Sequence, residues 1–70
     1  MSNRSRNDDP VEVNCVLLFD NEESYKIEDA DGWEVYLPKS ECDVLPKDAG
    51  EGEDITVTMP EWLAVEKGLV

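Results

Sequence analysis

The sequence contains no histidine, which removes the commonest general base and the commonest metal ligand of proteins. Only 6 of the 70 residues are Lys or Arg. Nucleic-acid binding releases counterions where basic side chains meet phosphates, so direct binding to nucleic acid is not expected. No apolar run approaches the ~18 residues that a membrane helix needs, and residues 1–10 contain no apolar signal region. These absences predict a cytoplasmic protein without membrane contact.

Catalytic patterns are missing as well. Neither Cys15 nor Cys42 has a His partner, and no Gly-x-Ser-x-Gly or phosphate-cradling glycine loop occurs. A domain of this size offers little room for the concave pocket of a catalytic site. We therefore expect no enzyme and no cofactor. Thiols stay reduced in the cytoplasm, which disfavours a Cys15–Cys42 disulfide, and Cys15 is predicted to be a core residue because it lies in an apolar run.

Acidic residues are the abundant feature, with 18 Asp and Glu and a net charge of −12. Such a surface repels nucleic acid and anionic membranes and attracts basic protein surfaces. A globule of this length is about 28 Å wide by its expected radius of gyration, and duplex DNA of about 28 Å carries about 16 phosphate charges. The charge density is thus comparable to that of DNA. Solubility alone would account for the same composition.

The polarity pattern divides the chain into a flexible leader, residues 1–10, and a single small domain, residues 11–70. Apolar and polar residues alternate over 11–20, which predicts a strand whose apolar face runs from Val11 to Phe19. Alternation over 24–29 and 33–37, joined by "DADG", predicts a hairpin, because Asp and Gly tolerate the positive φ of tight turns. The three segments make a three-stranded antiparallel meander.

The C-terminal third predicts one more strand, residues 55–59, followed by a short helix that begins near Pro60. Gly68 suits the left-handed position after a helix, and Trp62, Val65 and Leu69 are spaced as a stripe facing the sheet. In the preceding linker, Val44 and Leu45 are expected to enter the core.

The predicted fold class is α+β, a small antiparallel sheet of about four strands packed by one C-terminal helix. The residues expected to be mostly buried are Val13, Cys15, Leu17, Tyr25, Ile27, Trp33, Val35, Leu37, Ile55, Val57, Trp62 and Leu63.

The acidic residues are the candidate partner-binding site, because they fall on the predicted solvent face, the turns and the linker. The candidates are Glu12, Asp20, Glu22, Glu23, Glu28, Asp29, Asp31, Glu34, Asp48, Glu51, Glu53 and Asp54. "DADGWE" superficially resembles a calcium loop. A calcium loop of this class needs a Glu at its twelfth position, where this chain has Ser40, and helical flanks, where this chain predicts strands. An acidic hairpin turn is therefore preferred, and no metal site is expected.

Two stretches, "WEVYLPKSECDV" and "ITVTMPEWLAVEKGLV", resemble a family of short acidic phage and prophage proteins. That family pairs a hairpin ending in "PKS" with a final I-x-V-x-x-P-x-W-L-A-x-x-K-G-L segment. The resemblance covers residues 11–70. The matching residues are Trp33, Pro38, Lys39, Ser40, Ile55, Val57, Pro60, Trp62, Leu63, Ala64, Lys67, Gly68 and Leu69.

Within this phage context, the chain is similar in size and charge to anti-CRISPR proteins of the type I-C inhibitor kind. The resemblance implies a monomeric inhibitor in the cytoplasm of a host bacterium, acting as a DNA mimic. Its partner would be the basic DNA-binding surface of a CRISPR surveillance complex subunit. The alternative from a different class is a phage accessory or regulatory interaction module whose acidity only keeps it soluble.

Overall fold

The structure is a computed structural model in which residues 9–70 are described. Its elements are β1 (Pro10–Asp20), β2 (Ser24–Glu28), β3 (Glu34–Pro38), a 3-10 turn (Lys39–Glu41), β4 (Asp43–Leu45), β5 (Asp54–Pro60) and α1 (Glu61–Glu66). The strands pair antiparallel in the order β3-β2-β1-β5-β4. The α+β class, with one short C-terminal helix, is confirmed. The sheet has five strands rather than four.

The additional strand is β4, which pairs with β5 and lies at one edge of the sheet. Val44 lies opposite Val57 and is buried, as predicted, but Leu45 lies opposite Thr56 and is 52% exposed. The expectation that Leu45 enters the core was wrong, because successive side chains of a strand point to opposite faces. A strand of three residues followed by Pro46 is too short to give a periodic signal in the sequence.

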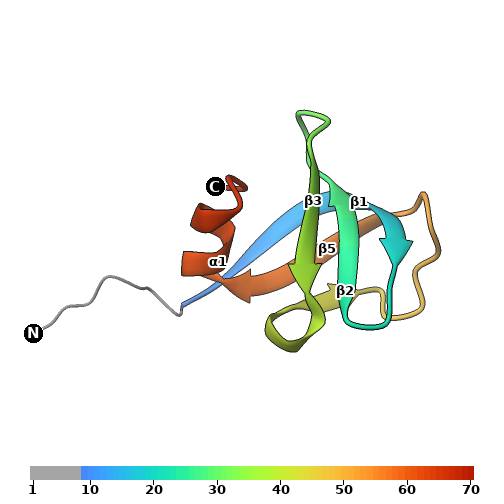
Figure 1. The fold of residues 1–70 in the computed structure, drawn as a ribbon, viewed down its shortest axis with the longest axis horizontal. Helices are drawn as coiled ribbons and strands as arrows, with labels where there is room; N and C mark the ends of the chain where they lie inside the picture. The colour runs from blue at the N-terminus through green and yellow to red at the C-terminus, as the bar shows by residue number, and fades with distance from the viewer. Residues whose placement is uncertain (1–8) are drawn as a thin grey trace, which may run out of the picture.

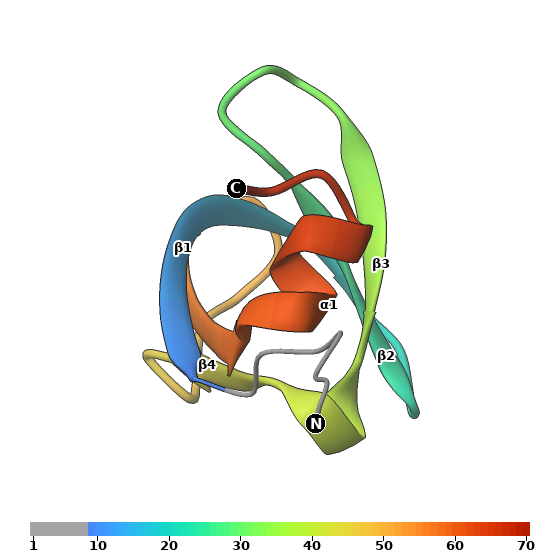
Figure 2. The same ribbon diagram turned by 90° about the vertical axis from the view of Figure 1, so that its left-hand side faces the viewer.

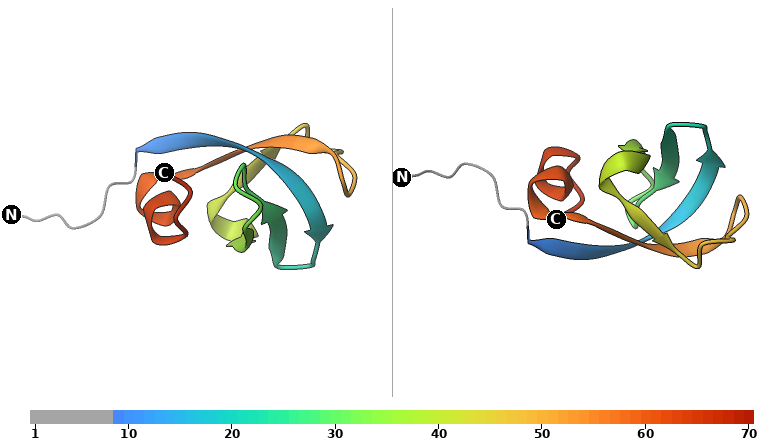
Figure 3. Two further views of the ribbon diagram at one scale, coloured as in Figure 1. Left: turned by 90° about the horizontal axis from the view of Figure 1, so that it is seen from above. Right: turned by 90° about the horizontal axis from the view of Figure 1, so that it is seen from below.

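The sheet curls so that one side encloses the core, with α1 at one end of the enclosed space (Figure 2). From above and below, α1 lies at one end of the paired β1 and β5, and the β2–β3 hairpin lies toward the other (Figure 3). Burial confirms most of the expected core, while Tyr25, Val35 and Trp62 are only half-buried against it. The core residues are Val13, Cys15, Leu17, Ile27, Leu37, Cys42, Val44, Ile55, Val57, Met59, Leu63 and Ala64.

A β-bulge interrupts the alternation of β1. Leu17 lies opposite Ile27, but Phe19, and not Leu18, lies opposite Lys26. The extra residue shifts the strand by one position, so Phe19 turns to the face opposite Leu17 and is 48% exposed. The prediction that Phe19 belongs to the apolar core face of this strand was therefore wrong.

Trp33 is a further correction to the expected core, since it is 71% exposed instead of buried. It precedes β3 in the β2–β3 loop, which projects beyond the rest of the molecule (Figure 1). The backbone N–H groups of Asp31 and Trp33 both donate to Asp29 Oδ1 at 2.9 Å, and the Gly32 N–H donates to the Asp29 carbonyl. Gly32 has a φ of 87°, as the expected hairpin requires. The alternation of apolar and polar residues in the sequence extends to Trp33, but the enclosed core ends before it.

The helix buries Leu63 and Ala64, whereas Val65 is exposed and Trp62 and Leu69 are half-buried. The expected stripe of Trp62, Val65 and Leu69 was therefore wrong at Val65. The buried face of the helix includes Ala64 instead. The end of the helix is as predicted: Gly68 has a φ of 74°, and the Leu69 N–H donates to the Ala64 carbonyl at 2.8 Å. This 6→1 bond is the Schellman arrangement that ends helices at glycine.

Strand β1 begins at Pro10, one residue before the expected start of the domain at residue 11. Pro10 is the first residue of β1 and lies opposite Pro60, and the Asp9 carbonyl accepts a hydrogen bond from the Glu61 N–H at 2.9 Å. The rest of the expected leader, residues 1–8, lies outside the described residues. Within residues 9–70, no helix is long and apolar enough to cross a membrane.

Two leucines test the placement of the core. Leu37 is fully buried, and Leu45 on the edge strand is half exposed. Leu37→Ala should lower the free energy of unfolding by about 2–5 kcal/mol, since it removes buried methyl groups and leaves a cavity. Leu45→Ala, the same chemical change at an exposed position, should change it by about 0.5 kcal/mol or less. Urea unfolding measures both, and equal losses would contradict this assignment of faces.

Two glycines test the helix end. Gly68→Ala should lower the free energy of unfolding by about 1–2 kcal/mol, because a Cβ is strained in the left-handed region. No atom lies within 4 Å of the Cβ that this change adds, so backbone strain alone is measured. Gly50→Ala, where φ lies outside that region, should leave stability unchanged or raise it slightly through the unfolded chain. Thermal unfolding of the two variants under the same conditions compares their stabilities.

Candidate partner-binding surface

The side of the sheet that faces away from the core is called here the outer face. Strand pairing arranges its side chains in rows, because residues opposite one another on neighbouring strands point the same way. One row joins Asp43, Thr58 and Glu12, and the next joins Leu45, Thr56 and Asn14. Most of these side chains are polar and all are at least partly exposed, so this half of the outer face is available to a partner.

A third row crosses four strands and is called here the acidic row. It comprises Asp54 on β5, Val16 on β1, Glu28 on β2 and Glu34 on β3. Glu28 lies directly opposite Glu34, and like charges so placed destabilise a sheet. Lys26 relieves part of this repulsion, since its Nζ lies 3.0 Å from Glu34 Oε1. The hydrogen bond to Glu34, and then the charge of that carboxylate, raise the pKa of Lys26.

The fourth row is called here the aromatic row and comprises Phe19, Lys26 and Tyr36. The bulge in β1 places Phe19 in it. Tyr36 is 56% exposed, and the Lys26 Nζ lies 5.7 Å from the centroid of its ring. This distance is within the range of cation–π attraction. The outer face thus changes along the strands from acidic to aromatic.

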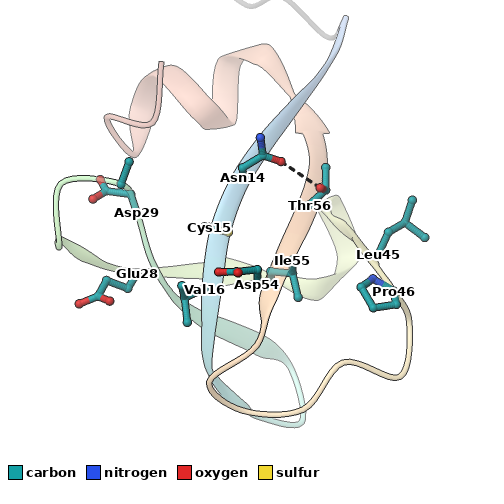
Figure 4. A pocket seen from close by; sticks show the side chains of 11 residues that line it. Asn14, Cys15, Val16, Glu28, Asp29, Leu45, Pro46, Asp54, Ile55 and Thr56 are labelled. Atoms are coloured by element: carbon teal, nitrogen blue, oxygen red, sulfur yellow. Dashed lines mark hydrogen bonds between the residues drawn. The ribbon is translucent and has the colours of Figure 1, made fainter.

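A shallow groove of about 390 Å³ is lined in part by Val16, Glu28 and Asp54 of the acidic row (Figure 4). Asn14 and Thr56 lie at one side of it, where the Thr56 hydroxyl donates to Asn14 Oδ1 at 2.9 Å. Leu45 and Pro46 line it from the β4 edge, and Glu28 lines it from β2. The lining residues are Asn14, Cys15, Val16, Glu28, Asp29, Ala30, Leu45, Pro46, Asp54, Ile55 and Thr56. An acidic groove with apolar walls suits a long cationic side chain.

Four of the twelve candidate acids lie on the outer face, and the others lie at the end of β1 or in turns and loops. The outer face holds Glu12, Glu28, Glu34 and Asp54. Asp20, at the end of β1, forms an ion pair with Lys39, whose Nζ also lies 4.9 Å from the Tyr25 ring centroid. The hydrogen bond to Asp20 raises the pKa of Lys39. The acids chosen as candidates from the sequence therefore lie on more than one surface of the protein.

The turn and loop acids have separate surroundings. Glu22 and Glu23 are exposed in the β1–β2 turn, Asp31 at the β2–β3 hairpin, and Asp48 and Glu51 in the β4–β5 loop. Glu53 Oε1, in the same loop, accepts a hydrogen bond from the Gly50 N–H at 2.7 Å.

Sequence reasoning missed Asp43 and the outward turn of Phe19. The pairing of Asp43 with Thr58 places Asp43 in one row with Glu12, on the other side of Thr58, and a strand signal at 43–45 would have found it. The bulge that exposes Phe19 has no marker such as Gly in the sequence.

The calcium-like stretch is a hairpin turn, as the sequence favoured. Asp29 Oδ1 accepts the N–H groups of Asp31 and Trp33, so the carboxylate closes its own loop. Within residues 9–70, no three His, Cys, Asp or Glu side chains are grouped so as to hold a metal ion.

Both cysteines are free and buried. Burial raises the pKa of the Cys15 thiol to about 11, with a smaller contribution from the charge of Asp29. Burial, followed by the neighbouring charges of Glu41 and Asp43, raises the pKa of Cys42 to about 11. The thiols are thus protonated at neutral pH, and a protonated thiol is a poor nucleophile. The prediction that Cys15 is a core residue is confirmed.

Comparison with protein-family models, with curated proteins and with solved structures gave no significant match to this chain.

The thiols provide a test of burial. A rise in pKa from 9.0 to about 11 lowers the thiolate fraction at pH 8, so both cysteines should react slowly with a disulfide reagent in the folded protein. In urea the reaction should accelerate by about a hundredfold or more, since the thiolate fraction and the access both increase. Cys15→Ala and Cys42→Ala each leave one thiol to follow. Rapid reaction of either thiol in the native state would contradict its placement.

Proposed function

We propose that the protein is an inhibitor that occupies the basic DNA-binding surface of another protein in place of DNA. The observation that carries this proposal is the acidic row with its flanking acids Glu12 and Asp43 on one exposed face of the sheet. Residues 9–70 contain 17 carboxylate side chains against 4 lysines, a net charge of −13. Such a surface repels DNA and attracts the lysines and arginines that hold DNA phosphates.

The sheet supports this role because it fixes the positions of its carboxylates. Neighbouring strands lie about 4.8 Å apart and alternate residues of a strand about 7 Å apart, so acids on one face form a lattice. Rigid placement reduces the ordering cost of binding. Each exposed ion pair contributes about 1 kcal/mol or less, so the affinity is spread over many acids. The exposed ion pair with Lys26 offsets part of the charge of Glu34.

The target class comes from the resemblance to short acidic phage proteins. We propose that the protein acts in the cytoplasm of a bacterial host and binds a CRISPR surveillance complex at its DNA-binding surface. No catalysis and no cofactor enter this mechanism, since occupancy of the surface is sufficient to exclude DNA.

A second candidate function has its own observation in favour. Phe19, Trp33 and Tyr36 are large, exposed side chains of the kind that anchor protein interfaces. In this alternative the chain is an accessory or regulatory module whose recognition is apolar and whose acidity serves solubility. The two candidates differ in salt dependence, because only the first weakens steeply as ionic strength rises.

The test is target-DNA binding by purified type I CRISPR surveillance complexes in a gel-shift titration with the full chain. Addition of the chain should prevent DNA binding, and excess duplex DNA or added salt should reverse the inhibition. The triple variant Glu12→Lys, Glu28→Lys and Asp54→Lys should weaken inhibition about tenfold to a hundredfold, because it reverses three charges on the outer face.

The matched control reverses three exposed acids that lie apart, Glu22→Lys, Glu51→Lys and Glu66→Lys, with the same change in net charge. It should weaken inhibition less than the outer-face triple. Inhibition that ignores salt and both triples, but is lost on truncation of one exposed aromatic side chain, would contradict DNA mimicry and support the apolar recognition of the second candidate.

A further inference from the structure

The aromatic row borders the acidic row on the same exposed face. Rings and carboxylates placed side by side favour one kind of basic side chain over another. We propose that the outer face selects arginine over lysine, by holding a guanidinium group of a basic protein partner between the Tyr36 ring and the carboxylates of Glu28 and Glu34. The inference rests on the proposed function, since it specifies which basic side chain that partner supplies. The proposed occupant of this surface is an arginine-bearing segment of a protein.

The register places the components within reach of one side chain. Glu34 and Tyr36 are two residues apart on β3, and therefore lie on the same face about 7 Å apart along the strand. Glu28 lies opposite Glu34 on the neighbouring strand β2. The aromatic side chains at both ends of the aromatic row are about half exposed. An arginine side chain laid across β2 and β3 therefore meets a ring and two carboxylates together.

Lys26 demonstrates how this surface holds a cation, and Lys39 shows the same combination of groups elsewhere on the protein. The Lys26 Nζ lies 3.0 Å from Glu34 Oε1 and 5.7 Å from the Tyr36 ring centroid. Lys39 repeats the arrangement, because it forms an ion pair with Asp20 while its Nζ lies 4.9 Å from the Tyr25 ring centroid. In both places a carboxylate and a tyrosine ring share one ammonium group. The surface between Glu34 and Tyr36 is thus already suited to a positive charge.

Arginine fits these groups better than lysine does. Its planar guanidinium stacks on aromatic rings and donates two parallel hydrogen bonds to a carboxylate, whereas an ammonium group is a compact and strongly hydrated point charge. Lys26 does not close the site, because its ion pair with Glu34 is exposed and such pairs are weak. Glu28 takes part in no ion pair among residues 9–70 and offers the incoming guanidinium its second carboxylate. Lys26 is then an internal competitor for the site.

Charge complementarity favours a cationic occupant over an apolar one. Carboxylates line the acidic row beside the aromatic row, and an apolar partner would have to remove water from them without compensation. An arginine covers the aromatic surface and neutralises the carboxylates in the same contact. The preference would direct the protein to arginine-rich parts of a DNA-binding surface.

The experiment uses isothermal titration of the full chain with oligoarginine and with oligolysine of equal length and charge. Oligoarginine should bind about twofold to fivefold more tightly, as stacking on an exposed ring would give. Tyr36→Leu, which keeps an apolar side chain in the strand and removes the ring, should abolish the preference, and Tyr36→Phe should keep it. Lys26→Met should strengthen oligoarginine binding while the preference is retained or increased. Unfolding midpoints establish that each variant is folded.

Trp33→Ala is the control, because Trp33 is an exposed aromatic residue that lies at the hairpin and not in the aromatic row. It should leave the preference unchanged. Loss of the preference in Trp33→Ala but not in Tyr36→Leu would overturn the inference and move the contact to the hairpin. Equal, salt-sensitive binding of both peptides would overturn the inference and leave the proposed function standing. Binding of neither peptide would overturn both.

Discussion

The whole fold depends on the antiparallel pairing of β1 with both β2 and β5. β1 is the central strand, and its register with β5 runs without interruption from Pro10 opposite Pro60 to Val16 opposite Asp54. This pairing brings the two ends of the described chain together, so α1 begins where β1 begins and closes one end of the core. It also fixes which side chains share a face. A shift of one residue would exchange Val13, Cys15 and Leu17 with Glu12, Asn14 and Val16. The burial of the core and the exposure of the acids are therefore consequences of one register.

The surface chemistry follows from the same constraint. Because the enclosed side of the sheet takes the apolar residues of every strand, the alternate positions must carry the charge, and the cross-strand register gathers them into rows. The bulge after Leu17 interrupts this alternation of faces, and it does so at one end of β1 only. It turns Phe19 outward beside Lys26 and Tyr36, so the aromatic row is created by a single extra residue. A regular strand would have placed Phe19 toward the core and left the outer face without this aromatic end.

The sequence predicted those features that strict alternation or a fixed backbone requirement controls. The apolar faces of β1, β2, β3 and β5 and the glycine end of α1 belong to this group. It did not predict Phe19, Trp33 or Leu45, because their positions depend on a bulge, on the extent of the enclosed core and on the pairing of a three-residue strand. These are tertiary effects with no periodic signal. The placement of Glu12, Glu28 and Glu34 on the solvent face was predicted from the alternation and is confirmed. The register adds Asp54, which was expected in the linker, and Asp43, which was not a candidate.

The placement of the lysines explains why the negative charge of this acidic chain is not uniform over its surface. Lys26 lies beside Glu34 and the Tyr36 ring, close to where Glu28 and Glu34 face one another directly, and reduces that repulsion. Lys39 lies beside Asp20 and the Tyr25 ring at the other end of the β2–β3 pairing. No equivalent ion pair is present on the outer face near Glu12, Asp43 and Asp54 within residues 9–70. The acidic half of the outer face therefore keeps its full charge, and the aromatic half is partly neutralised. A partner that approaches this face meets long-range attraction first and short-range aromatic contact second, which is the order in which steering and selectivity act.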